Sequence, residues 1–144
     1  MMELLERYAS VENQRYQGAV HVQIHHAPGL DPTAIKVPPL LIQPFVENTF
    51  KHAFGGDYTK DAEVEVYFQE QGNRHLLVTI KDNGRGFRPG ETKNTSMGMR
   101  IVAQRLSLFP EFEPHHLQVD SIPGKGTTIS VLIPRLDQIA LVQK

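Results

Sequence analysis

Residues 62–81 read AEVEVYFQEQGNRHLLVTIK, and this stretch decides the fold class. The apolar side chains of Val64, Val66 and Phe68 alternate with side chains that point to the other face. This is the period-two pattern of a half-buried strand. Gly72-Asn73 favours a tight turn, and residues 75–81 have the composition of a second strand. The stretch therefore predicts a β-hairpin with strands at residues 62–69 and 75–81.

Two helices and a strand are predicted on the N-terminal side of this hairpin. Residues 1–15 carry apolar side chains at three- and four-residue spacing, which predicts an amphipathic helix that starts abruptly, like the tail of a longer one. Residues 18–25 alternate at period two and predict a strand. Pro38-Pro39 opens a second helix that runs to about Phe54, where Gly55-Gly56 stops it.

On the C-terminal side, residues 82–96 are rich in glycine and polar side chains and predict a loop. A helix is predicted from Met97 to Leu108, with Pro110 close to its end. A last hairpin joins residues 117–122 to residues 127–133. The sum predicts an α/β (α+β) two-layer sandwich, with a mixed, mostly antiparallel sheet and helices on one face.

The composition fits one soluble domain and excludes several classes of site. A chain of 144 residues with 40% hydrophobic residues is long enough for one core. The net charge of −1 gives no global field that would attract nucleic acid or a membrane surface. Zero cysteines exclude disulfides and thiolate chemistry. No apolar run approaches the roughly 20 residues that span a bilayer, and no signal peptide is visible, so we expect a cytoplasmic location.

The segment 43–52 places several polar side chains on an otherwise apolar helix. Glu47, Asn48, Lys51 and His52 lie at positions i, i+1, i+4 and i+5. An amide oxygen is a suitable Mg²⁺ ligand beside phosphate oxygens, and the two cationic side chains are suited to neutralising phosphates. The alternative is a solvent-facing helix with an ordinary Glu47–Lys51 ion pair, and the segment taken alone favours that alternative.

The segment Asp82-Asn83-Gly84-Arg85-Gly86 combines a carboxylate at a strand end with two glycines. A carboxylate accepts a hydrogen bond from an exocyclic amine such as that of adenine, and glycines let a flat ring approach the backbone. Because Asp-Asn-Gly is also a common turn sequence, the segment taken alone favours a plain turn.

Two further segments are each open to a structural explanation. Residues 96–100 (Ser-Met-Gly-Met-Arg) lead into a helix whose free N–H groups suit a phosphate, although a simple cap by Ser96 explains them equally well. Residues 124–127 (Gly-Lys-Gly-Thr) are most simply a hairpin turn, with a threonine hydroxyl beside the base as the functional alternative. The histidine pairs at 25–26 and 115–116 are interpreted as surface or strand residues, not zinc ligands.

Taken in order, these segments resemble the motifs of the histidine-kinase-type ATPase family (the GHKL or Bergerat-fold group), specifically the catalytic domains of LytS-like sensor histidine kinases. Residues 41–52 resemble the N box and residues 82–86 the G1 box. Residues 98–100 resemble the G2 box, and residues 124–127 the last glycine box. Four boxes in this order, over nearly the whole chain, form a specific signal.

The resemblance implies a role for each matching residue. Asn48 would ligate Mg²⁺, Glu47 would polarise water or the metal shell, and Lys51 and His52 would contact phosphates. Asp82 would hold the adenine amine, Thr127 would support the base through water, and residues 88–97 would form a lid. The residues expected to bind the nucleotide are Asn48, Asp82, Gly84, Gly86, Met97, Gly98, Met99, Gly126 and Thr127.

Three positions depart from the family pattern. Pro44 stands where the first asparagine of the N box is usual, a change that the LytS-like subgroup tolerates. Ser96 replaces a usual glycine and adds a Cβ to the lid turn, whereas Met99 replaces a leucine without harm to packing. No phosphoacceptor histidine helix precedes the domain in this sequence.

The resemblance implies the ATP-binding catalytic domain of a two-component sensor histidine kinase, with ATP and Mg²⁺ as cofactors. Residues 1–16 would end a linker or dimerisation helix, and residues 17–144 would form the ATPase domain. The γ-phosphate would pass to a histidine on a separate dimerisation domain and then to a response regulator. The parent protein would be a homodimer anchored in the inner membrane. The alternatives are a degenerate nucleotide-binding or interaction module and an anti-sigma-type serine kinase of the same fold.

Overall fold

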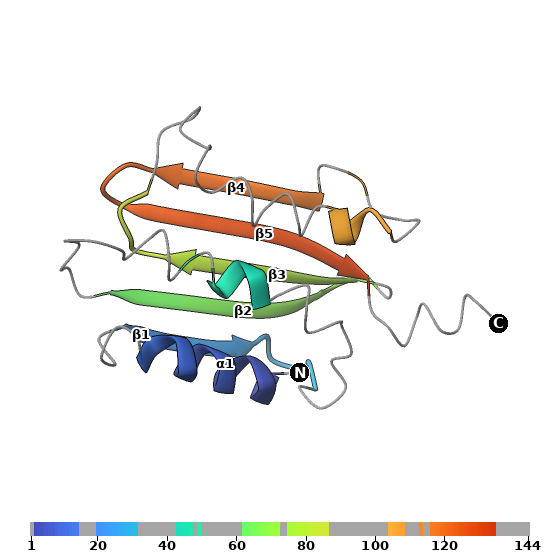
Figure 1. Ribbon diagram of the computed structural model, residues 1–144. Helices are drawn as coiled ribbons and strands as arrows, with labels where there is room; N and C mark the ends of the chain where they lie inside the picture. Colours follow the sequence, from blue (N-terminus) through green and yellow to red (C-terminus); the bar gives the residue numbers. More distant parts are fainter. Residues whose placement is uncertain are drawn as a thin grey trace.

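The computed structural model of the chain describes residues 2–14, 20–31, 43–47, 49, 62–72, 75–86, 104–108, 113 and 116–134. Its principal elements are one helix and five strands (Figure 1). They are α1 (Met2–Gln14), β1 (His21–His26), β2 (Glu63–Gln71), β3 (His75–Asp82), β4 (Leu117–Ile122) and β5 (Gly126–Pro134). Residues 43–47, 49 and 104–106 are also helical. These elements agree in kind and order with those expected from the sequence.

The strands form one mixed sheet in the order β1-β2-β3-β5-β4. Only β1 and β2 are parallel, and the other neighbouring pairs are antiparallel. Parallel strands need a crossover connection between them, and the chain between β1 and β2 includes the helical residues 43–47. Both predicted hairpins are present, and Gly72 has the positive φ of 67° that suits its turn.

Two strand boundaries differ from the prediction in a way that matters for the site. The sequence places Asp82 at the start of a loop and Gly126 in a turn, whereas both residues belong to strands. The reason is the register: β3 stays paired with β5 until Asp82 lies opposite Thr127. The glycine-rich segments that follow Asp82 and precede Thr127 therefore meet at one end of the sheet.

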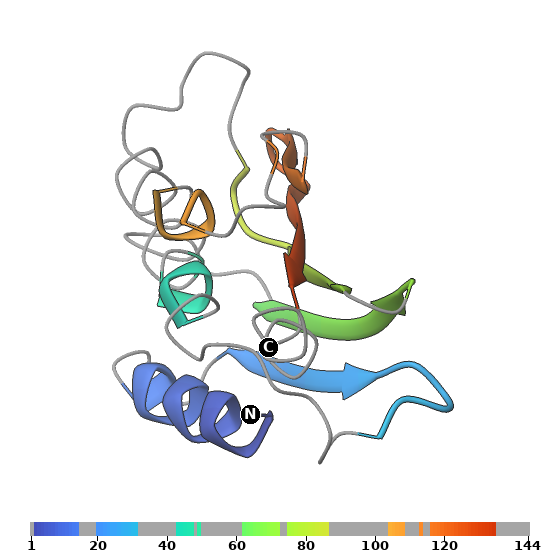
Figure 2. The same cartoon turned by 90° about the vertical axis from the view of Figure 1, so that its right-hand side faces the viewer.

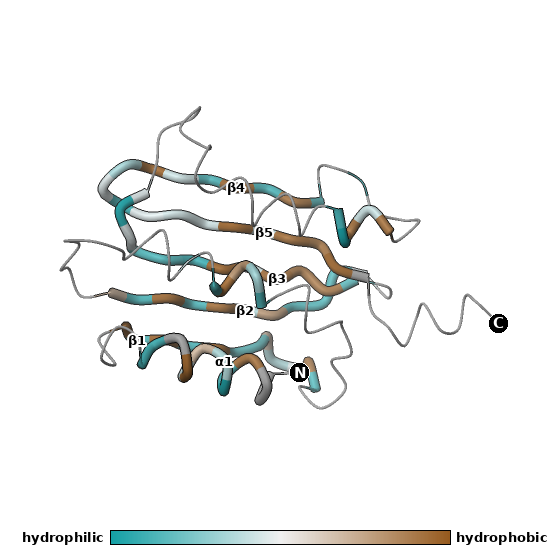
Figure 3. The backbone as a smooth tube through the Cα atoms, viewed as in Figure 1, coloured by the Kyte–Doolittle hydropathy of each residue, from teal (hydrophilic) through white to brown (hydrophobic). Residues whose placement is uncertain are grey.

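Helices cover one face of the sheet, which confirms the two-layer prediction. In Figure 2 the helical segments all lie on the same side of the strands. Leu5 and Ala9 of α1, together with Phe45, Val46 and Leu106, are buried in a common core with the strands. Along β2 and β3 the buried residues alternate with exposed or half-buried ones. Figure 3 shows hydrophobic residues along both strands. Burial of these apolar side chains is the main term that holds the layers together.

The side chain of Asn13 joins the end of α1 to the start of β1. Its Nδ2 atom donates a hydrogen bond to the Val20 carbonyl oxygen at 2.6 Å, and its Oδ1 atom accepts one from the Val20 N–H at 3.1 Å. Because Val20 bonds to this amide, the strand begins at His21, whose N–H donates to the Ala62 carbonyl oxygen. The sequence predicted that the strand starts at residue 18, whereas in the structure Val20 precedes the strand.

Replacement of Asn13 by alanine is expected to lower the free energy of unfolding by about 1–2 kcal/mol, because two hydrogen bonds are lost and the Val20 backbone, in a buried residue, loses its partner. Urea denaturation measures this loss. The matched control is Gln14→Ala, since Gln14 is exposed on the same turn of α1 and should change stability by less than about 0.5 kcal/mol. Equal effects of the two variants would show that the bonds to Val20 contribute nothing.

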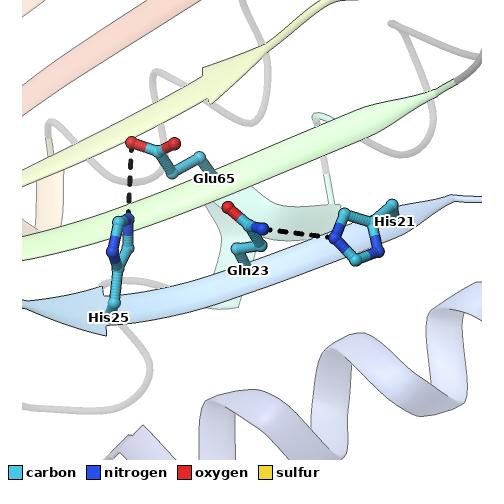
Figure 4. A network of polar contacts seen from close by, with 4 residues as sticks. All are labelled: His21, Gln23, His25 and Glu65. Atoms are coloured by element: carbon cyan, nitrogen blue, oxygen red, sulfur yellow. Dashed lines mark hydrogen bonds and ion pairs between the residues drawn. The ribbon is translucent and has the colours of Figure 1, made fainter.

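The face of the sheet opposite to the described helices carries mostly polar side chains, with Leu77, Leu132 and Ile122 as apolar exceptions. On it, Nε2 of His25 lies 3.4 Å from Oε1 of Glu65, and the amide of Gln23 contacts the His21 ring at 3.2 Å (Figure 4). These side chains are exposed, so such contacts contribute little to stability. Among the residues that the structure describes, no group of three or more histidine, cysteine, aspartate or glutamate side chains lies close enough to hold a metal ion.

The described part of the chain contains no helix with the length and hydropathy needed to cross a bilayer.

Candidate functional site

One row of side chains interrupts the apolar pattern on the helix-facing side of the sheet. Asp82 of β3 lies opposite Thr127 of β5, which in turn lies opposite Ser121 of β4. Side chains that lie directly opposite on neighbouring strands have Cβ atoms about 4.5–5.5 Å apart. The next row on the same face, two residues along, is apolar (Ile80, Ile129 and Val119). Polar groups are therefore gathered at the end of the sheet where β3 stops.

Asp82 is the only buried charged side chain among the residues that the structure describes, with 6% of its surface exposed. Its Oδ1 atom accepts a hydrogen bond of 2.8 Å from the N–H of Gly84, two residues further on. Burial raises the pKa of the Asp82 carboxyl to about 6, although hydrogen bonds from the backbone of Gly84 and Thr127 lower it in part. A perturbed carboxyl of this kind at the end of a strand is a candidate functional group.

The local structure at Asp82 is compatible with both interpretations of the segment 82–86, a plain turn and a carboxylate placed to bind a ligand. The contact with Gly84 is the Asx turn that Asp-Asn-Gly favours. Next to it, Oδ1 of Asn83 accepts a bond of 2.7 Å from the Glu63 N–H, and the Asn83 N–H donates to the Glu63 carbonyl oxygen at 3.2 Å. Asn83 thus fastens the turn to the start of β2. The predicted turn is therefore present in the structure, and it holds the buried Asp82 carboxylate in a fixed position.

The two glycine-rich segments pack against each other with no room for side chains at two positions. A Cβ on Gly126 would lie 2.0 Å from the backbone oxygen of Asp82, and a Cβ on Gly86 would lie 2.2 Å from the backbone oxygen of Ile122. Both residues also have positive φ, 129° for Gly126 and 65° for Gly86. The Gly124 N–H donates to the Arg85 carbonyl oxygen at 2.7 Å. These backbone contacts alone require glycine at positions 86 and 126, independently of any space that the glycines provide for a ligand.

Glu47 lies on the helical residues 43–47 and its side chain is exposed. Phe45 and Val46, which precede it, are fully buried and hold this helix against the sheet. The hydroxyl of Tyr8 on α1 donates to Oε2 of Glu47 over 3.4 Å, a long hydrogen bond that links the two helices. The hydroxyl of Thr49 donates to the Phe45 carbonyl oxygen at 2.9 Å, a bond to the preceding turn of the same helix.

The structure thus describes six of the residues proposed from the sequence and brings five of them together. Asp82, Gly84, Gly86, Gly126 and Thr127 converge at one end of the sheet, and Glu47 comes from the helical layer. Outside the described residues lie Asn48, Lys51, His52, Met97, Gly98 and Met99, together with the whole of the expected lid at 88–97.

Sequence reasoning missed Ser121, which completes the polar row. The alternation of the strand at residues 117–122 contains the signal, because it places Leu117, Val119 and Ser121 on one face. The register that sets this face beside Thr127 depends on the turn between β4 and β5, which the sequence alone left open.

Comparison with known proteins agrees with this geometry. The family described as histidine kinase-, DNA gyrase B-, and HSP90-like ATPase matches residues 38–137. The signal transduction histidine-protein kinase/phosphatase DegS of Brevibacillus brevis is 35% identical over 65% of this chain and 22% of its own length. The sensor histidine kinase/phosphatase LytS of Staphylococcus aureus (strain Mu50) is 27% identical over 85% of this chain and 20% of its own length.

A solved structure gives the same result for the fold. The blue-light activated histidine kinase of Erythrobacter litoralis EL346 superimposes with a TM-score of 0.66 and 26% identity, over 96% of this chain and 43% of that one. The chain spans less than half the length of each of these three proteins. The five-stranded mixed sheet with helices on one face is thus the fold of histidine kinase catalytic domains. The chain belongs to the family of histidine kinase-, DNA gyrase B- and HSP90-like ATPases, as a catalytic domain of the histidine kinase type.

Proposed function

We propose that this chain is the ATP-binding catalytic domain of a two-component sensor histidine kinase of the LytS-like group. It binds ATP with Mg²⁺ and delivers the γ-phosphate to a histidine on a separate dimerisation domain. The observation that carries the proposal is the buried Asp82 carboxylate, fixed between a glycine turn and the start of β5 in a chain of this ATPase family.

Asp82 is the residue that selects the base. With a pKa raised to about 6 the carboxyl is ionised at pH 7, and it then accepts a hydrogen bond from the exocyclic amine of adenine. A purine with an oxygen in place of that amine would place a second hydrogen-bond acceptor against the Asp82 carboxylate. Binding of such a purine is disfavoured because neither acceptor then has a donor. Thr127, directly opposite Asp82, contributes a hydroxyl to the same end of the sheet and supports the base through water.

The phosphates lie toward the helices in this proposal. Asn48 is a Mg²⁺ ligand, Lys51 and His52 neutralise phosphate oxygens, and Glu47 polarises water or the metal shell. The backbone of Met97, Gly98 and Met99 contacts phosphates, and residues 88–97 close as a lid. Phosphoryl transfer needs positioning and charge neutralisation more than covalent chemistry, so this set of residues is suited to it.

The chain is proposed to divide into a linker helix end at residues 1–16 and an ATPase domain at residues 17–144. Its partners are the dimerisation domain that carries the phosphoacceptor histidine and, downstream, a response regulator. The parent protein is proposed to be a homodimer anchored in the inner membrane, with this domain in the cytoplasm.

Nucleotide titrations test the proposal directly. A fluorescent, non-hydrolysable ATP analogue is expected to bind with a Mg²⁺-dependent affinity, and Asn48→Ala is expected to abolish the dependence on Mg²⁺, because it removes the proposed amide ligand. Gln71→Ala is the control, since Gln71 is exposed at the end of β2 that pairs with His75, remote from Asp82. Absence of binding by the unchanged protein at millimolar nucleotide would favour the degenerate module instead.

The phosphoacceptor is identified with the full-length parent protein and labelled ATP. A phosphohistidine is labile in acid, so the label should be lost on brief acid treatment and retained in alkali. An acid-stable product would favour an anti-sigma-type serine kinase.

A further inference from the structure

The hydroxyl of Ser121 makes two contacts at the end of the polar row. Its Oγ atom lies 2.8 Å from Oγ1 of Thr127, and it donates a hydrogen bond to the carbonyl oxygen of Gly126 at 3.2 Å. Both contacts are partly buried. Gly126 is itself packed against the backbone of Asp82, so this carbonyl oxygen is held in place by the sheet.

The number of hydrogens links the directions of these two bonds. A serine hydroxyl carries one hydrogen, and a carbonyl oxygen accepts but never donates. When Ser121 gives its hydrogen to the Gly126 carbonyl, the short contact with Thr127 requires the Thr127 hydrogen, donated to Oγ of Ser121. Thr127 then has only lone pairs left for any further partner.

We propose that Ser121 determines base specificity by fixing the Thr127 hydroxyl as a hydrogen-bond acceptor toward the ligand. The inference rests on the proposed binding of a purine nucleotide at Asp82. With Ser121 in place, Asp82 and Thr127 both present acceptors along the row, which suits the amine at position 6 of adenine and a water that donates to Thr127. Ser121 acts through Thr127 and is a positioning residue.

Removal of the Ser121 hydroxyl frees the Thr127 hydrogen. Thr127 is then able to donate, directly or through water, to an oxygen at position 6 of a purine. The cost of binding a 6-oxopurine therefore falls, while the bond from the adenine amine to Asp82 is unaffected. The signature of this role is a change in the preference between two bases, which a general loosening of the hairpin would not produce.

The experiment compares dissociation constants for ATP and inosine triphosphate, which differ in the group at position 6 and the adjoining ring proton. The unchanged chain is expected to prefer ATP. Ser121→Ala is expected to reduce that preference about fivefold, the magnitude of one neutral hydrogen bond. Ser121→Thr keeps a hydroxyl and is expected to retain the preference. Ser130→Ala is the matched control, because Ser130 lies on β5 with a side chain on the opposite face.

The outcomes separate this inference from the proposed function. If the unchanged chain prefers ATP and Ser121→Ala keeps the full preference, the inference is wrong and the proposed function stands. If Ser121→Ala weakens both nucleotides equally while Ser121→Thr restores both, the hydroxyl supports the site without selecting the base, and the inference is again wrong. If the unchanged chain binds neither nucleotide, the proposed function and the inference fail together.

Discussion

Gly126→Ala is expected to lower the free energy of unfolding by about 3–5 kcal/mol, enough to leave much of a marginally stable domain unfolded. The added Cβ would lie 2.0 Å from the Asp82 backbone oxygen and 3.0 Å from Cα of Asn83. These atoms are backbone atoms of a paired strand and its turn, so they cannot rotate away as a side chain does. The φ of 129° adds strain of its own, because only glycine adopts it readily.

Gly124→Ala is the matched control for this prediction. Gly124 lies two residues earlier in the same turn with a φ of 78°, and a Cβ there would meet no atom within 4 Å. It should therefore cost only the strain of a left-handed residue, about 1–2 kcal/mol. Urea denaturation of both variants isolates the contact with β3 as the difference between them. Equal losses would mean that the backbones of β3 and β5 separate at little cost.

Asp82→Asn is expected to weaken ATP binding about 100-fold. The asparagine side chain cannot form the charge-assisted hydrogen bond with the adenine amine, a bond of about 1.5–3 kcal/mol. Its NH2 group can also face the adenine amine, so that two donors meet. Isothermal titration calorimetry with the ATP analogue and Mg²⁺ measures the loss. Asp120→Asn removes a carboxylate from an exposed position of β4, which is separated from β3 by β5, and should leave affinity unchanged. Unchanged affinity of Asp82→Asn would contradict the assignment of the base site.

The same substitution is expected to stabilise the unliganded protein at neutral pH. In the unfolded chain Asp82 loses its proton near pH 3.8, whereas in the folded chain it keeps the proton until about pH 6. Stability therefore falls as the pH rises through this window, and above it the ionised carboxylate costs about 3 kcal/mol. Asparagine removes this cost but holds the Gly84 and Thr127 N–H groups less well, so we expect a net gain of about 1–2 kcal/mol at pH 7.

Urea denaturation at two pH values tests the origin of this gain. At pH 4 Asp82 is protonated in the folded protein, so the advantage of Asp82→Asn over the unchanged chain should largely vanish. A gain of equal size at pH 4 and pH 7 would exclude ionisation as its cause. A loss of folding stability of this kind is expected where a binding site needs a buried charge.

Local patterns predicted the elements, since the alternation in residues 62–81 and the turn glycines depend only on neighbours along the chain. They did not predict the burial of Asp82, because it depends on the pairing of β3 with β5 across many residues. The same pairing explains why Gly126, expected in a turn, forms the start of a strand. Ser121 was missed because its position beside Thr127 depends on a second register, that of β4 with β5. The roles of Asn48, Lys51, His52 and residues 97–99 stay predictions from family resemblance.

The close approach of Gly86 to Ile122 also bears on how such a chain tolerates insertions and deletions. Because Gly86 packs against the backbone of Ile122, the segment between these two residues, which includes β4, begins and ends at nearly one point. Doubling the length of a segment anchored in this way costs only about 0.6 kcal/mol in closure entropy. Length changes between these anchors, at residues 87–103, should therefore be neutral for the pairing of β2, β3 and β5.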